Sequence, residues 1–175
     1  MRIGFTGTMS VGKTTLVNAL KEIPEFKDYK FATERSAYLS SLGIPLNHET
    51  TLEGQTIFLA ERVSEIMQEK IITDRTILDV MAFTRCADKI NYTEYEKFIN
   101  YASMFLEKYD YIFYISPEGI KAEDNGIRET NTIYRKKIDE TIQKSFFKYG
   151  GGRKWHTISG STEERIEQIT NFIQF

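Results

Sequence analysis

The chain has 175 residues, of which 41% are hydrophobic, and its formal charge at pH 7 is −2. The hydrophobic share supports a folded core, while one cysteine and two histidines exclude a disulfide framework and a Cys/His zinc cluster. The slightly acidic balance disfavours an electrostatic grip on nucleic acid but leaves it open. No apolar run is long enough to span a bilayer and no signal-peptide pattern begins the chain, so we expect a cytoplasmic protein with no membrane partner.

Taken in chain order, short apolar runs alternate with longer amphipathic ones. The apolar runs predict five β-strands, at residues 2–6, 30–33, 70–73, 111–115 and 155–158. Between them apolar residues recur at helical spacing, and Asn91 and Ser161 each precede a glutamate at the capping-box distance that begins a helix. Short apolar strands separated by helices predict an α/β fold whose parallel sheet is covered on both faces. With no repeat and no break in composition, residues 1–175 are expected to form a single domain.

Residues 7–14 form a complete G-x-x-x-x-G-K-[ST] motif between the first strand and a helical segment. Glycines in the loop allow the tight turn that points backbone N–H groups at a phosphate. Lys13 would place its charge on the β- and γ-phosphates, the Thr14 hydroxyl suits Mg²⁺, and Thr15 would lie near the α-phosphate. The motif therefore predicts that ATP and Mg²⁺ bind to one run of residues, namely Gly7, Thr8, Met9, Ser10, Val11, Gly12, Lys13, Thr14 and Thr15.

Several classes of protein use such a loop, and the rest of the chain helps to separate them. A small GTPase normally carries Asn-Lys-x-Asp after a later strand, but the run at 111–115 is followed by Ser-Pro-Glu. A motor ATPase normally needs a longer chain. A small kinase fits best. Two alternatives stay open: an ATP-binding or ATP-hydrolysing switch, and a kinase that acts on a base or an end within nucleic acid.

Charged pairs follow the second and third predicted strands, Glu34-Arg35 and Asp74-Arg75. Ligands of an open parallel sheet bind beyond the carboxyl ends of its strands, so both pairs should face one site. Asp74 is expected to hold Mg²⁺ through water. Arg35 and Arg75 are expected to bind the acceptor or its phosphate, and Glu34 to position the hydroxyl that is phosphorylated. The alternative for Glu34-Arg35 is a solvated pair at the start of a helix, and the alternative for Asp74-Arg75 is a plain capped turn after a strand.

Arg128, Asn131 and Arg135 share one face of a predicted helix that follows a polar loop. Residues of about 117–135 would thus form a lid whose two arginines bind ATP and neutralise the transferring phosphoryl group. A solvated basic helix face is the alternative. Gln55 lies among apolar residues of another helix, where it either reads the edge of a nucleobase or is a partly exposed residue near the helix start.

These segments together resemble the NadR-like P-loop kinases of the AAA group, which are related to deoxynucleoside and thymidylate kinases. The resemblance is carried by residues 7–15 (GTMSVGKTT), 32–36 (ATERS), 72–84 (ITDRTILDVMAFT), 123–131 (EDNGIRETN) and 158–166 (ISGSTEERI). It implies a three-layer P-loop NTPase fold, with a five-stranded parallel sheet of order 2-3-1-4-5 and a short lid bearing arginine. It also implies that Gly160 and Ser161 lie near the adenine of ATP, that the Asp-Arg pair belongs to the acceptor site, and that Glu34 lies near the acceptor hydroxyl.

We therefore expect an ATP-dependent kinase whose acceptor is a nucleoside or a nucleoside monophosphate. The residues expected to act on the reacting groups are Lys13, Glu34, Arg75, Arg128 and Arg135. The residues expected to bind the acceptor are Glu34, Arg35, Gln55 and Arg75. Arginines suit a monophosphate whereas Glu34 suits a free hydroxyl, so the sequence leaves the acceptor open. The oligomeric state is open too, a homodimer included.

Overall fold

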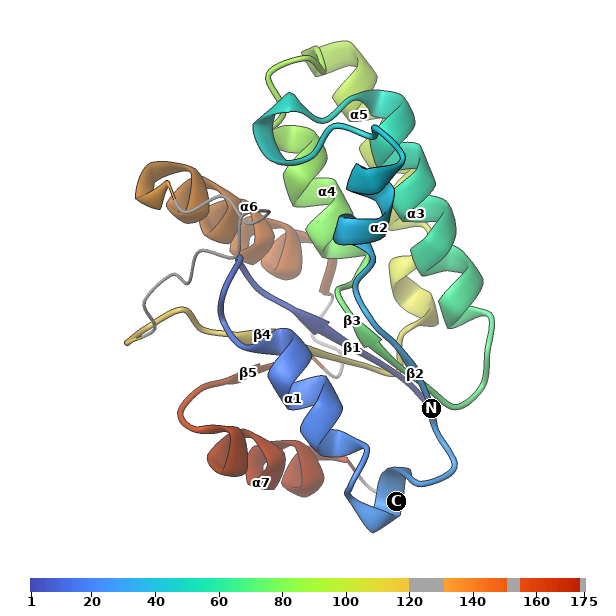
Figure 1. The fold of residues 1–175 in the computed structure, drawn as a ribbon, viewed down its shortest axis with the longest axis vertical. Coiled ribbons are helices and arrows are strands. Elements are labelled where there is room, and N and C mark those ends of the chain that lie inside the picture. Colours follow the sequence, from blue (N-terminus) through green and yellow to red (C-terminus); the bar gives the residue numbers. More distant parts are fainter. Residues whose placement is uncertain (120–130, 151–154, 174–175) are drawn as a thin grey trace.

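The computed structural model of the chain describes residues 1–119, 131–150 and 155–173 (Figure 1). The strands are β1 (Arg2–Thr6), β2 (Lys30–Ala32), β3 (Ile71–Asp74), β4 (Tyr111–Ile115) and β5 (Trp155–Ile158). The helices are α1 (Lys13–Leu20), α2 (Ser36–Ser41), α3 (Leu52–Ile66), α4 (Ile77–Arg85), α5 (Tyr92–Ser103), α6 (Thr132–Gly150) and α7 (Thr162–Phe172). All five predicted strands are confirmed. The third lies one residue later than predicted, so that Asp74 is the last residue of β3.

The five strands form one parallel sheet in the order β2-β3-β1-β4-β5, which confirms the order that the resemblance implied. β1 is the central strand and pairs with β3 through Phe5 and Asp74, and with β4 through Thr6 and Tyr114. This register ends β1 and β3 at the same edge of the sheet. The loop that follows β1 and the residues that follow β3 therefore begin side by side.

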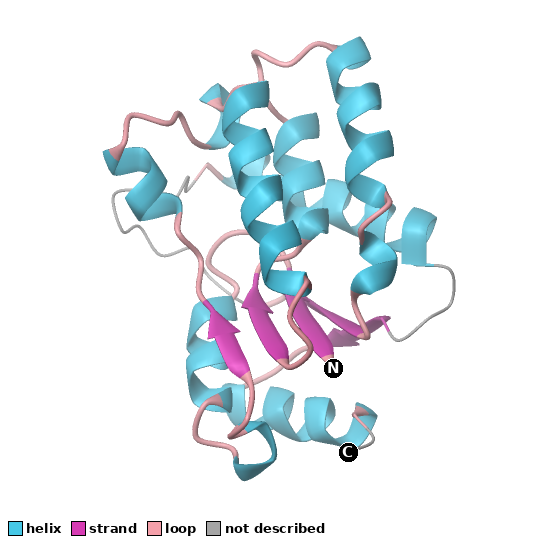
Figure 2. Cartoon of the chain, turned by 90° about the vertical axis from the view of Figure 1, so that its right-hand side faces the viewer, coloured by secondary structure: helices cyan, strands magenta, loops and turns pink. Residues whose placement is uncertain are grey.

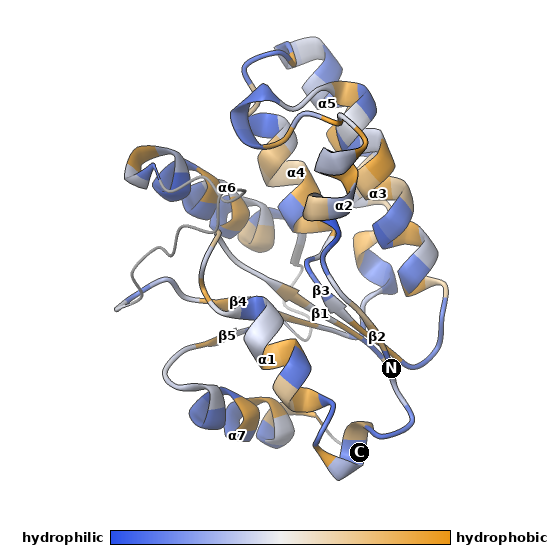
Figure 3. Ribbon diagram, in the orientation of Figure 1, coloured by the Kyte–Doolittle hydropathy of each residue, from blue (hydrophilic) through white to orange (hydrophobic). Residues whose placement is uncertain are grey.

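Helices cover both faces of this sheet and give the molecule its three layers (Figures 1 and 2). α1 and α7 pack on one face, and α3 to α6 pack on the other. Side chains of β4 alternate between the two: Phe113 joins the core under α1 and α7, whereas Ile112 and Tyr114 join the core under α3 to α6. Figure 3 shows apolar residues on the helix faces that turn toward the sheet. None of the described helices combines the length and the apolar character needed to cross a membrane.

The predicted helix starts are confirmed. Asn91 caps α5 and Ser161 caps α7, each in a reciprocal capping box with the glutamate three residues later. Thr76 forms the same arrangement with Asp79 at the start of α4, two residues after β3 ends. Arg75 is thus held between Asp74, the last residue of β3, and a capped helix, at the edge of the sheet where β1 also ends.

Candidate active site

The loop after β1 has the strained backbone that its glycines predict. Gly7, Ser10 and Gly12 adopt φ angles of 148°, 60° and 83°, in the region that side chains disfavour. A Cβ atom on Gly7 would lie 2.8 Å from the backbone oxygen of Ile115, so glycine is required there by space as well as by conformation. The loop leads directly into α1, whose N-terminus adds a partial positive charge to the site.

Lys13 is buried at the start of α1, and its Nζ donates hydrogen bonds to the carbonyls of Gly7 and Thr8 at 2.6 and 2.8 Å. Burial foremost, and then the neighbouring cation of Arg75, lower the pKa of Lys13 to about 8, although nearby carboxylates oppose this shift. The lysine charge is therefore held in this loop at a cost. An anion placed among the same atoms would relieve that cost.

Thr14 and Asp74 meet beneath the loop, although 60 residues separate them. The Thr14 hydroxyl donates to Oδ2 of Asp74 at 2.6 Å, and Asp74 is 1% exposed. No described residue donates a hydrogen bond to the buried Oδ1 of Asp74. A hydroxyl and an acidic oxygen are ligands that Mg²⁺ prefers, so these two side chains fit that ion. The described residues hold no cluster of three histidine, cysteine or acidic side chains, and a metal here would complete its shell with phosphate and water oxygens. Thr15 is exposed.

Two hollows meet at Glu34 and Arg75. The first, the phosphate-loop hollow, is lined by residues 9–14 with Glu34, Asp74 and Arg75. The second, which we call the acceptor pocket, shares Glu34 and Arg75 and continues between α2, α3 and α4. Nε of Arg75 lies 3.7 Å from Oε1 of Glu34. The carboxylate and the guanidinium thus form the wall between the two hollows.

Arg75 is held in an uncommon backbone conformation, with φ of 94°. Its N–H donates to the carbonyl of Phe5 at 3.1 Å, and its guanidinium lies over the ring of Phe83, 5.2 Å from the centroid. Burial disfavours its charge, yet the neighbouring carboxylates, Glu34 foremost, raise the pKa of Arg75. The side chain is therefore a fixed cation that faces both hollows.

The acceptor pocket also contains the predicted residues Arg35 and Gln55. Gln55 is 3% exposed and its Nε2 donates to the Thr50 hydroxyl at 2.9 Å, so the alternative of a partly exposed glutamine is wrong. Arg35 is half exposed, and its guanidinium forms an ion pair with Glu61 on α3 at 3.1 Å. The rest of the lining is largely apolar and includes Phe58, Val80 and Phe83.

Arg62 on α3 binds the backbone of Asp74, the candidate metal ligand, and the sequence analysis did not identify it. Its Nη1 donates to the Asp74 carbonyl at 3.1 Å, its Nη2 lies 2.6 Å from Oε1 of Glu65, and it is 3% exposed. Burial raises the pKa of Glu65 to about 7, although Arg62 opposes that shift. The signal that would have found this residue is a charged side chain on the apolar stripe that contains Leu59 and Ile66.

Arg165 on α7, on the face of the sheet opposite to α3, also binds the phosphate loop, and the sequence analysis did not identify it. Its Nη1 donates to the Val11 carbonyl at 2.8 Å, the side chain is 5% exposed, and burial lowers its pKa. Gly160 and Ser161 form the loop and cap that begin this helix. The segment that the resemblance links to adenine is therefore continuous with a residue that fixes the phosphate loop.

The N-terminal end of α6 contacts the same loop through Arg135. Nη2 and Nε of Arg135 donate to the Met9 carbonyl at 2.9 and 3.3 Å, and the Thr8 hydroxyl donates to the Arg135 carbonyl at 3.0 Å. Arg128 and most of the expected lid lie outside the described residues. The structure thus brings Arg135 to the phosphate loop as a backbone-binding group.

Comparisons with known proteins agree with this architecture. The sequence matches the AAA domain family over residues 2–165. The deoxyadenosine kinase from M. mycoides, solved with bound dCTP, is similar with a TM-score of 0.69 at 18% identity, over 98% of this chain and 97% of that chain. The NadR protein, solved in complex with NR, is similar with a TM-score of 0.74 at 14% identity, over 99% of this chain and 51% of that chain. No curated protein matches the sequence. The likeness to NadR-like P-loop kinases is thereby confirmed for the fold.

Proposed function

The chain belongs to the AAA domain family, and from that premise we propose that it is an ATP-dependent kinase that phosphorylates a nucleoside. One observation carries the proposal: the phosphate-loop hollow and the acceptor pocket share Glu34 and Arg75 as a common wall. A phosphoryl group bound at the loop and a hydroxyl bound in the pocket would meet at this wall. Proximity of this kind supplies much of the rate of phosphoryl transfer.

In the proposed mechanism, Lys13 and the backbone of the loop bind the β- and γ-phosphates of ATP. Thr14 and Asp74 would hold Mg²⁺, which neutralises phosphate charge. Glu34 accepts the proton of the acceptor hydroxyl as its oxygen bonds to the γ-phosphorus. The bond from that phosphorus to the bridging oxygen breaks, and ADP leaves with the electron pair. Arg75 faces the same point and stabilises the charge on the transferring group.

The two arginines of the acceptor pocket both lie beside carboxylates, and this favours a nucleoside over a nucleoside monophosphate as the acceptor. Arg35 is bound to Glu61, and Arg75 lies beside Glu34, so each candidate phosphate ligand already faces a carboxylate. The apolar walls and the Gln55 amide are suited to a flat, polar-edged base. These contacts support an uncharged acceptor whose hydroxyl points at Glu34.

The acceptor pocket is narrow in this structure, at about 40 Å³. Small-molecule pockets usually measure about 300–1,000 Å³. Binding a nucleoside therefore requires movement of the wall, and we expect it in the segment from Ser36 to Thr50. This segment includes the short α2 and a 3₁₀ turn, whose Asn47 has a φ of 57°. Such a rearrangement on binding is common among regulatory and catalytic sites.

The decisive experiment incubates the chain with γ-labelled ATP, Mg²⁺ and a panel of nucleosides and nucleoside monophosphates. We expect label on a nucleoside, and a loss of about 100-fold or more in kcat for Glu34→Gln with ATP affinity retained. Glu107→Gln is the matched control, because Glu107 is exposed in the turn before β4. ADP release that is independent of any acceptor would instead identify a switch, and label on an added oligonucleotide would identify a nucleic-acid kinase.

Two further expectations complete the proposal. The single cysteine, Cys86, is buried and free, which suits the reducing cytoplasm, where ATP and nucleosides are available. The acceptor is proposed as the principal partner, and the oligomeric state stays a prediction to be measured by sedimentation.

A further inference from the structure

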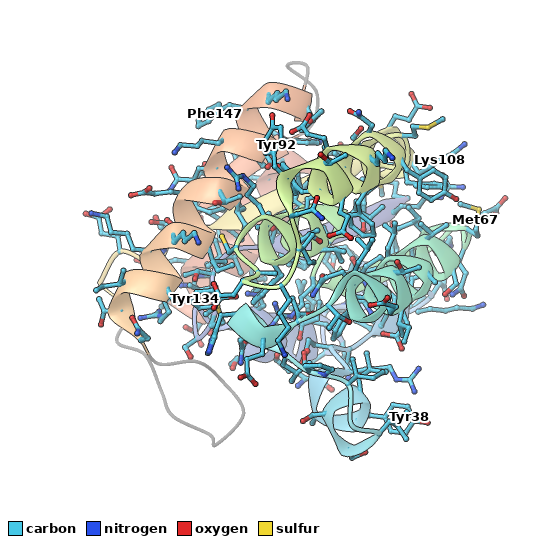
Figure 4. The ribbon with its side chains drawn as sticks, turned by 90° about the horizontal axis from the view of Figure 1, so that it is seen from above. Tyr38, Met67, Tyr92, Lys108, Tyr134 and Phe147 are labelled. Atoms are coloured by element: carbon cyan, nitrogen blue, oxygen red, sulfur yellow. The ribbon has the colours of Figure 1, made fainter. Side chains whose placement is uncertain are left out.

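A third hollow lies on the far side of α6 from the phosphate loop. It measures about 570 Å³ and runs between α6 and the ends of α4 and α5. Its lining includes Arg85, Tyr95, Lys137, Lys144 and Lys148. We call it the basic groove. Figure 4, which views the molecule from above, shows Tyr92 of α5 at the same end of the molecule as Phe147 of α6.

The charge of the basic groove is unbalanced. Lys137, Lys144 and Lys148 are spaced seven and four residues apart, which places them on one stripe of α6. Arg85 faces them from the end of α4, while Glu140 is the carboxylate in the lining. Within the described ranges, no carboxylate lies within salt-bridge distance of any of these four cations. Tyr149 first and then Glu96 favour the charged form of Lys148 and raise its pKa, so this lysine is partly balanced, while the groove as a whole keeps four cations against the single lining carboxylate of Glu140.

Arg85 is fixed at the groove by aromatic rings. Its guanidinium lies over the rings of Tyr95 and Tyr92, 5.1 and 5.9 Å from their centroids. A guanidinium stacked on a ring keeps the N–H donors of its edge available, and that edge matches the geometry of phosphate oxygens. The lysines across the groove are exposed and add point charges along its length.

The groove is separate from the phosphate loop but shares a helix with it. Nine residues separate Arg135 from Lys144, about two and a half turns, so their side chains leave α6 on opposite faces. Arg135 holds the Met9 carbonyl of the phosphate loop on one side, while Lys144 lines the groove on the other. A ligand in the groove would therefore touch the helix that grips the loop without entering the active site.

We propose that the basic groove is a second anion site that binds the polyphosphate of a nucleotide. The stripe from Lys137 to Lys148 covers about 16 Å of helix, which is long enough for a triphosphate and its sugar. The volume falls in the range of small-molecule pockets. The chain as a whole carries a charge of −2, which disfavours an extended nucleic-acid track, so the compact ligand is the better match.

The test counts nucleotide sites by calorimetry on the full chain with MgATP. We expect two sites in the natural chain. Lys137→Glu with Lys144→Glu should leave the affinity of the phosphate-loop site unchanged and weaken the groove site by about tenfold or more. The matched control is Lys97→Glu with Lys108→Glu, which carries the same charge change at exposed positions outside the groove and should keep both sites. Equal melting temperatures would show that the variants fold.

A Lys13→Met background isolates the groove. Titrating it with MgATP and with inorganic tripolyphosphate should show one remaining site, with ATP bound at least as tightly as tripolyphosphate. The proposal would be overturned by a single site in the natural chain, or by the absence of any remaining site in Lys13→Met. A groove site of undiminished affinity in the variant with Lys137→Glu and Lys144→Glu would overturn it too. Tighter binding of a short oligonucleotide than of ATP would overturn it as well. Because the kinase assay is not used, failure of the proposed activity does not affect these counts.

Discussion

Binding of MgATP should draw a proton onto Lys13, and the number of protons can be worked from the structure. Burial lowers the pKa of Lys13 to about 8 in the free protein. At pH 8 about half of the molecules then carry a neutral lysine, and at pH 7 about a tenth do. Phosphate oxygens beside the amine favour its charged form and return the pKa toward its ordinary value. Binding should therefore take up about half a proton at pH 8 and about a tenth at pH 7.

Calorimetry in several buffers measures this uptake. At fixed pH, the observed binding enthalpy changes linearly with the ionisation enthalpy of the buffer, and the slope is the number of protons taken up. The sign also fixes the pH dependence of binding: affinity for MgATP should fall as pH rises above about 8, because a neutral lysine must first be protonated.

Lys13→Arg is the control for this experiment, because arginine stays charged at all these pH values. Its uptake at pH 8 should be close to zero. A natural chain with no uptake at pH 8, or an equal uptake in Lys13→Arg, would refute the reasoning that burial depresses this lysine.

The remaining predictions concern stability and the positioning of the loop. Lys13→Met should raise the free energy of unfolding of the free protein at pH 7 by up to about 3 kcal/mol in chemical denaturation. The reason is that the fall in the pKa of Lys13 from 10.5 to about 8 measures the cost of burying its charge, and this cost is lost only as the pH rises from about 8 toward 10.5. An unchanged free energy of unfolding would contradict this. Arg165→Met should weaken ATP binding about tenfold with little change in the acceptor KM, with Arg165→Lys intermediate, because the Val11 carbonyl loses its donor; equal losses for ATP and acceptor would point to a general folding defect. Asp74→Asn should lower kcat by about 100-fold and raise the Mg²⁺ concentration needed for half activity; an unchanged Mg²⁺ requirement would remove Asp74 from the metal site. Gly7→Ala should cost about 2 kcal/mol or more and abolish ATP binding, as seen by thermal melting and titration, because its Cβ would meet a backbone oxygen at 2.8 Å; native affinity would show that the loop can relax.

Much of the fold could be predicted because its signals are local. The glycines, Lys13 and Thr14 are neighbours in one loop, and their spacing alone identifies the phosphate site. The capping boxes at Asn91 and Ser161 depend on residues three apart. Apolar runs gave the strands to within one residue, with Asp74 moved from the loop into β3. The sheet order came from family resemblance, since pairing of distant strands leaves no local pattern.

The candidate site could be predicted only in part. Asp74, Glu34 and Arg75 lie where the strand-end rule put them, beside Lys13 of the loop motif, and the roles of all four stay predictions. The contacts by which Arg62, Arg135 and Arg165 bind backbone carbonyls at the site could not be predicted. The expected action of Arg135 on the phosphates stays a prediction, and the contact of its guanidinium with the Met9 carbonyl is one that the sequence did not indicate.

What the sequence determined by itself is the chemistry of the loop: which backbone can turn, which amine carries charge and which hydroxyl can face a metal. What only the tertiary structure decided is how that loop is held. Arg165 reaches Val11 across 154 residues, and Arg62 reaches the Asp74 carbonyl from a helix on the opposite face of the sheet from α1. A buried arginine on an amphipathic helix looks like any charged residue until packing brings a carbonyl to it. The guanidinium needs such a contact because it has lost its water, and it loses that water only when the helices pack on the sheet.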